Sequence, residues 1–185
     1  MLGPTRAAAI GLRPPDYEMA SRIPDHVRRL RKDETTAAAV GAVGSHAWLW
    51  QLRLSQTRAE LALARGAFET AVVEATEGIG HSQTKGRRRP KYEALGLTTR
   101  ARALHSLGQT RDAIADARQA VVVARGTHDP ALLLLALDGF LVIDGDDESA
   151  AEALELDRRI STALPNEAIR QRFAESEVVQ RVRRC

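Results

Sequence analysis

Cysteine is almost absent from this sequence, since the only one is Cys185, the last residue. An internal disulfide is therefore excluded, and we expect a reducing, cytoplasmic location. Aromatic residues make up only 4%, so the core has to be built from Ala, Leu, Val and Ile. Small side chains allow close helix packing and favour helical layers over a sheet sandwich. No apolar run reaches the roughly 18 residues of a membrane-spanning helix, so we expect no membrane span.

Motifs that carry catalysis or bind cofactors are also missing. The histidines are scattered without metal-ligand spacing, and the sequence contains no P-loop, no G-x-S-x-G motif and no Cys–His pair. The acidic run at 144–148 has Ser149 where an EF-hand needs a glycine, and a helix beginning with acidic residues explains the run better. We therefore expect no enzymatic activity, no cofactor and no metal site.

One pattern is present three times: a glycine followed five residues later by an alanine, at 66–71, 108–113 and 145–150. Each copy ends one apolar helical run and begins another, which is typical of stacked helical hairpins. The 3.6-residue periodicity predicts seven helices, at 45–65, 68–81, 91–107, 111–126, 130–143, 148–164 and 166–182. The helix at 130–143 is apolar on every side, so we expect it to be buried on every side. The last helix would cover it as a cap.

The first two copies resemble tetratricopeptide repeats, which carry Gly-x-aromatic-x-x-Ala at the turn and small residues where helices cross. The residues that carry this resemblance are Ala59, Gly66, Phe68, Ala71 and Gly78 in the first copy and Ala101, Gly108, Ala113 and Ala120 in the second. The turn glycines are 42 and 37 residues apart, against about 34 in the standard repeat. The third copy has Asp138 and Asp157 at the small positions. The resemblance implies an all-α, right-handed α-solenoid of about three antiparallel helix pairs, with a degenerate terminal repeat and a C-terminal capping helix.

The stretches 127–133, 144–146 and 164–173 are similar to the C-terminal end of the repeat regions in large bacterial signalling ATPases, nucleotide-cyclase-linked proteins and transcriptional activators. In those proteins the repeat region is a sensor or protein-binding segment. Their ATPase, cyclase and DNA-binding motifs are not visible in this sequence. The similarity therefore implies a scaffold role only.

Tetratricopeptide arrays bind partners on the concave surface formed by the first helix of each pair. The resemblance places these polar residues there: Arg53, Gln56, Glu60, Thr98, Arg102 and His105, beside Leu63 and Leu95. Two arginines on such a surface could bind a carboxylate bidentately, although an ordinary solvated surface fits the pattern equally well. The matching positions on the next first helix are too apolar to face water, so we expect the last helix to cover them: Leu132, Leu135, Gly139 and Val142.

Residues 1–45 are rich in Pro and Gly, and we expect a weakly ordered arm there, followed by a repeat domain at 46–183. Without a polar cap, the N-terminal end of the repeat array would self-associate or dock on a partner. Positive charge gathers at 28–32 and in a cluster of Lys85, Arg87, Arg88, Arg89 and Lys91. The sequence favours a charged inter-repeat loop, with nucleic-acid binding as the alternative. The leading hypothesis is a non-catalytic module that binds a protein or peptide.

Overall fold

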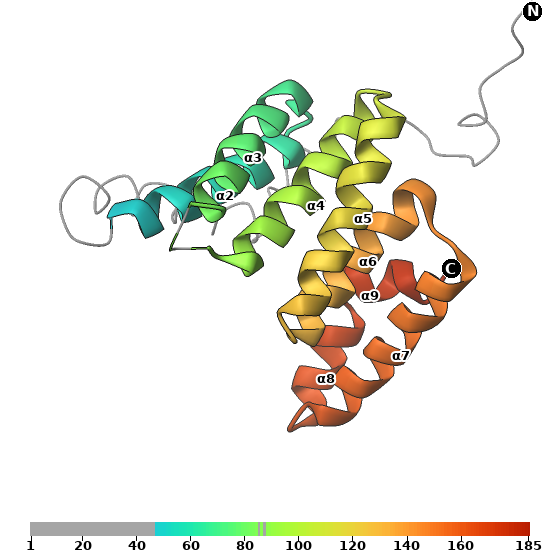
Figure 1. Ribbon diagram of the computed structural model, residues 1–185. Coiled ribbons are helices and arrows are strands. Elements are labelled where there is room, and N and C mark those ends of the chain that lie inside the picture. The colour runs from blue at the N-terminus through green and yellow to red at the C-terminus, as the bar shows by residue number, and fades with distance from the viewer. Residues whose placement is uncertain (1–46, 85, 87) are drawn as a thin grey trace, which may run out of the picture.

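The structure, a computed structural model, describes residues 47–84, 86 and 88–185, and within this part of the chain every regular element is a helix. The predicted arm at 1–45, including the basic segment at 28–32, lies outside the described residues. The all-α prediction is confirmed for the described part (Figure 1). Its helices are α2 (Ala47–Ala64), α3 (Phe68–Ser82), α4 (Pro90–Ser106), α5 (Thr110–Gly126), α6 (Pro130–Asp144), α7 (Asp147–Ala163), α8 (Glu167–Ala174) and α9 (Glu177–Val182).

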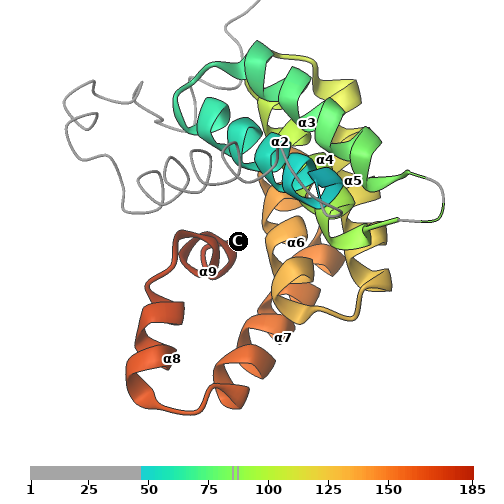
Figure 2. The same cartoon turned by 90° about the vertical axis from the view of Figure 1, so that its left-hand side faces the viewer.

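Each helix from α2 to α7 packs against the next one along the chain. In addition, α4 contacts both α2 and α6, whereas the backbones of α3, α5 and α7 are not in close contact with one another. Side chains do reach across between two of these helices, since Arg125 of α5 pairs with Glu152 of α7. After α7 the chain turns back through α8, so that α9 packs against α6 and α7 (Figure 2). None of the described helices is both long and apolar enough to cross a membrane.

The first two repeated glycines end their helices as predicted. Gly66 and Gly108 have φ of +73° and +75°, the left-handed conformation that glycine adopts without steric cost. At the second turn, the Gln109 N–H donates to the Leu104 carbonyl at 2.9 Å and satisfies the end of α4. The third glycine differs, because Gly145 has φ of −60°. At this turn a larger residue would not fit, since a Cβ on Gly145 would lie 2.7 Å from the Cα of Leu141.

The small residues predicted at the helix crossings are buried. They are Ala59, Ala71, Gly78, Ala101, Ala113 and Ala120. Side chains of this size let neighbouring helices approach closely, which is why a core with few aromatic residues packs well. In the third copy, the two positions hold aspartates that are buried as well.

The prediction that the helix at 130–143 is buried on every side is wrong near its end. Leu134, Leu137 and Phe140 are buried, but the side chain of Val142 is 47% exposed. The Asp129 carboxylate caps this helix by accepting from the Ala131 and Leu132 N–H groups at 3.1 Å. The neighbours of α6 are α4, α5, α7 and α9. In its last turn Leu141 and Ile143 are half-buried against the core, so only the face that carries Val142 is exposed there.

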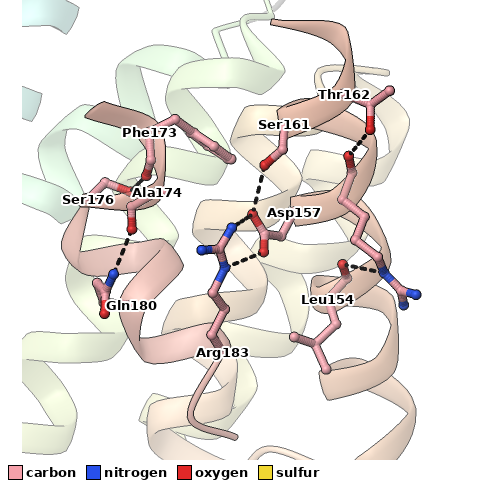
Figure 3. Close-up of polar contacts among 10 residues, drawn as sticks. Leu154, Asp157, Ser161, Thr162, Phe173, Ala174, Ser176, Gln180 and Arg183 are labelled. Carbon is pink, nitrogen blue, oxygen red and sulfur yellow. Dashed lines mark hydrogen bonds and ion pairs between the residues drawn. The ribbon is translucent and has the colours of Figure 1, made fainter. Parts of the chain in front are cut away.

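The prediction of one continuous last helix at 166–182 is also wrong, because this segment forms two helices, α8 and α9. Ser176 interrupts it with φ of −66° and ψ of 143°. The Ser176 hydroxyl donates to the Phe173 carbonyl at 2.7 Å, and the Gln180 amide donates to the Ala174 carbonyl at 2.7 Å (Figure 3). These side chains replace helical hydrogen bonds at the break, which periodicity alone does not reveal.

His128, which follows α5, has φ of +56° and is the only non-glycine residue with positive φ in the described part. Because a side chain with a Cβ is strained there, we expect His128→Gly to raise the free energy of unfolding by about 0.5–1 kcal/mol. Thermal unfolding followed by circular dichroism would measure the change. His81→Gly, inside α3, is the control and should destabilise the protein. Equal effects of the two substitutions would contradict the prediction.

Candidate protein-binding site

The six polar residues predicted to bind a partner lie on α2 and α4, which contact each other. The structure separates them by burial. Arg53 and His105 are exposed, and Glu60 and Arg102 are half-buried. Gln56 and Thr98 are only 5% and 7% exposed. The six therefore do not form one accessible surface.

Gln56 and Thr98 connect helices instead of facing a ligand. The Gln56 side-chain amide donates to Glu60 Oε1 at 2.7 Å and to Thr99 Oγ1 at 3.3 Å, which links α2 to α4. The Thr98 methyl group lies against α6, since a Cβ on Gly139 would be 3.0 Å from Thr98 Cγ2. Both side chains are enclosed by the helix packing in this structure, and a contact with a partner stays a prediction.

Arg102 is the predicted binding residue with the most unusual environment. Its guanidinium forms no ion pair or side-chain hydrogen bond with any described residue. Burial lowers its pKa, and repulsion from Arg181 lowers it further, while Asp138 and Glu177 act in the opposite direction. A half-buried arginine without a direct counter-ion is costly, and a bound anion would relieve that cost.

The four apolar positions on α6 are covered only in part, and by more than one neighbour. Leu132 is buried and Leu135 is half-buried, Gly139 lies against α4, and Val142 remains exposed. The last helix, α9, does pack on α6, as predicted, but it does not cover all four positions.

Two buried aspartates, which the sequence marked only as departures from the repeat pattern, hold α9. Asp138 on α6 and Asp157 on α7 are 2% and 4% exposed. Arg181 donates to Asp138 through Nε at 2.8 Å and Nη2 at 2.7 Å. Arg183 donates to Asp157 through Nε at 2.7 Å and Nη2 at 3.1 Å (Figure 3). Acidic residues at positions that need small side chains, together with arginines in the tail, were the signal in the sequence.

Both pairs have the fork geometry of a bidentate arginine–carboxylate contact, which is stronger than a single hydrogen bond. The hydrogen bonds to Asp138 and Asp157 raise the pKa of Arg181 and Arg183, respectively. Ser161 also donates to Asp157 at 3.3 Å. The third repeat thus replaces close contact between small residues by charge pairing with α9.

Three residues of the basic cluster already have partners within the protein. Arg88 donates to the buried Glu93 carboxylate at 3.0 Å, and Lys91 pairs with Asp129 at 3.3 Å. The Arg89 guanidinium lies 5.2 Å from the centre of the Trp48 ring. Lys85 and Arg87 lie outside the described residues. The side chains at 88, 89 and 91 therefore contribute to the folded body.

The acidic run before α7 is occupied by structural contacts. Asp144 pairs with Arg118 at 2.8 Å, and Asp146 caps α7 by accepting from the Ser149 N–H at 2.7 Å. The described residues contain no group of three or more His, Cys, Asp or Glu side chains that could hold a metal ion. An ion pair accounts for the Asp144 carboxylate, and the cap of α7 accounts for the Asp146 carboxylate.

A shallow hollow of about 620 Å³ lies along α7, next to Pro130 at the start of α6. Its polar lining consists of Glu155, Arg158, Arg159 and Thr162. The only hydroxyl in this lining, on Thr162, donates to the Arg158 carbonyl at 2.9 Å (Figure 3). The hollow therefore offers two arginines and apolar surface, without a nucleophile that contacts a base.

Comparison with protein-family models, with curated proteins and with solved structures found no match to this chain. The resemblance to tetratricopeptide repeats therefore stays a prediction.

Proposed function

We propose that this chain is a non-catalytic helical-repeat module that binds an acidic peptide or protein segment next to Arg102. The observation that carries this proposal is the environment of Arg102, which is half-buried and has no ion pair with any described residue. A carboxylate can accept two hydrogen bonds from such a guanidinium. A regulatory role in a signalling system and a cytoplasmic location belong to the same proposal.

The helix contacts support an α-solenoid of tetratricopeptide type, and right-handedness is part of this proposal. In a curved array of hairpins, one row of helices is crowded on the inner side and the other row is spread on the outer side. The contacts that α4 makes with α2 and α6, and the wider spacing of the α3, α5 and α7 backbones, agree with such a curvature. Arg102, on α4, would then belong to the inner row.

The proposal is tested by titrating the full chain with a fluorescein-labelled peptide that ends in Glu-Glu and a free carboxylate. We expect Arg102→Met to weaken binding about tenfold, because a charge-assisted hydrogen bond contributes about 1.5 kcal/mol. Arg102→Lys should retain part of the affinity, since it keeps the charge without the fork. Fluorescence anisotropy at fixed ionic strength measures the peptide affinity of wild type, Arg102→Met and Arg102→Lys.

The matched control is Arg111→Met, which removes an exposed arginine from α5. This substitution should leave the affinity unchanged. Equal loss in both Met variants would indicate non-specific attraction to positive charge. An unchanged affinity of Arg102→Met would remove the basis of the proposal.

Association with nucleic acid through the basic cluster and the 28–32 segment is the alternative function. It has less support, because Arg88, Arg89 and Lys91 already contact other side chains. A steep salt dependence of DNA or RNA binding, lost when the cluster is replaced by alanine, would favour it. Self-association at the N-terminal end of the array stays a prediction.

A further inference from the structure

The chain ends in a short helix whose attachment to the body is concentrated in very few residues. Val179 and Val182 of α9 are fully buried and belong to the main hydrophobic core. By contrast, α8 has no buried residue, although its half-buried Phe173 packs against the same core. The C-terminal segment is therefore held mainly at its end, and α8 connects α7 to that end (Figure 2).

The surface that receives α9 combines apolar side chains with two carboxylates. Asp138 on α6 pairs with Arg181 of α9, and Asp157 on α7 pairs with Arg183, the residue that follows α9. Carboxylates buried this deeply require a cation, because an unpaired buried charge is strongly destabilising. The surface therefore selects arginines two positions apart, next to the buried valines.

The segment that connects α7 to α9 permits α9 to leave the body without unfolding the preceding helices. The backbone is extended at Leu164, Asn166 and Ser176, so no continuous helix ties α9 to α7. Segments with few buried contacts open locally at lower free energy than a core opens. Leaving would expose mainly the three valines of α9, at 178, 179 and 182, and the two aspartates.

The charges of α9 act on Arg102 in opposite directions. Arg181 repels Arg102 and lowers its pKa beyond the effect of burial, whereas Glu177 attracts it. When α9 leaves, both effects end. Asp138, which already attracts Arg102, then keeps a cation nearby. The buried carboxylate is thus less costly to uncover than an isolated one.

We infer that the surface around Asp138 and Asp157 is a second binding site, which accepts a helix of a partner protein with the pattern Val-x-Arg-Val-Arg, and that α9 is its exchangeable occupant. The pattern is that of residues 179–183 of this chain. The inference goes beyond the proposed function, because its site is the acidic pair on α6 and α7 and its ligand is basic.

A partner protein is a better occupant than a second copy of this chain. A tethered segment competes at a high effective concentration, in the millimolar range for short linkers. The α9 of a second copy would bring only the same contacts and would gain nothing over the tethered one. A different helix that carries the same pattern can extend the contact beyond the six residues of α9.

The first test is hydrogen exchange of the full wild-type chain, measured by mass spectrometry. We expect α9 amides to exchange at least about tenfold faster than those of α4 and α6, through local opening. An excess of a peptide with the sequence of residues 166–185 should accelerate α9 exchange further, because it captures the vacated surface. A peptide with Glu in place of Arg181 and Arg183 is the control and should have no effect.

The second test uses the full chain with R181E and R183E, whose α4 and α6 protection is checked by the same exchange method. This variant should bind the labelled native peptide about tenfold or more tightly than wild type, since its own α9 competes poorly. Adding Asp138→Asn and Asp157→Asn should abolish the gain.

The inference would be overturned if the amides of α9 exchanged at the same rate as those of α6. It would also be overturned if the native and control peptides accelerated α9 exchange equally. If R181E with R183E does not fold, the exchange experiment on wild type decides alone. A wild-type dimer in light scattering that disappears in R181E with R183E would identify a second copy as the occupant and overturn the assignment to a partner protein.

Discussion

Leu137→Ala should lower the free energy of unfolding by about 3 kcal/mol, since removing a buried leucine side chain from a packed core typically costs 2–5 kcal/mol. Leu137 is 0% exposed and lies in the middle of α6, the helix that contacts α4, α5, α7 and α9. A cavity at this point affects several helix pairs at once. Urea unfolding followed by far-ultraviolet circular dichroism would measure the loss.

Val142→Ala, on the same helix, is the matched control. Val142 is partly exposed to solvent, so its truncation should change the free energy of unfolding by no more than about 0.5 kcal/mol. Similar losses in the two variants would mean that α6 is not the centre of the packing.

Ala113→Leu is expected to cost about 1–3 kcal/mol, because added methyl groups in a tightly packed site force neighbouring side chains or backbone to move. Ala113 is the fully buried alanine of the second repeated pattern. No cavity is available to accept the larger side chain if helices cross there at close range. Urea denaturation would measure the loss of unfolding free energy, provided that the m-value is the same in the variant and in wild type.

Ala115→Leu provides the control for this substitution, because it makes the same chemical change two residues further along α5. Ala115 is exposed, and leucine is nearly as good a helix former as alanine. The expected change is within about 0.5 kcal/mol. If Ala113→Leu were equally harmless, the alanine pattern would not report close helix crossings.

The helices could be predicted from the sequence because their signals are local. Gly108 ends α4, and Asp129 with Pro130 begins α6, at the predicted places. The break at Ser176 was missed, because a serine inside a periodic apolar pattern is compatible with a continuous helix. Side-chain hydrogen bonds at the end of α8 stabilise the break, and they depend on the local geometry of the folded chain.

The candidate site could be predicted only in part. The resemblance placed Arg102 on the partner-binding surface, and in the structure its guanidinium is half-buried and has no ion pair with a described residue. The same resemblance placed Gln56 and Thr98 on the surface, where the close approach of α2, α4 and α6 buries them. The pairing of Asp138 with Arg181 joins residues 43 positions apart, and no local pattern predicts such a partner.

Sequence alone was sufficient to establish the class of fold and the positions of the first six helices, because propensity, capping and periodicity act within a few residues. Which faces stay accessible, and where the C-terminal helix docks, followed only from the tertiary structure. Burial and ion pairing depend on distances between segments far apart in the chain, and those distances exist only after the helices have packed.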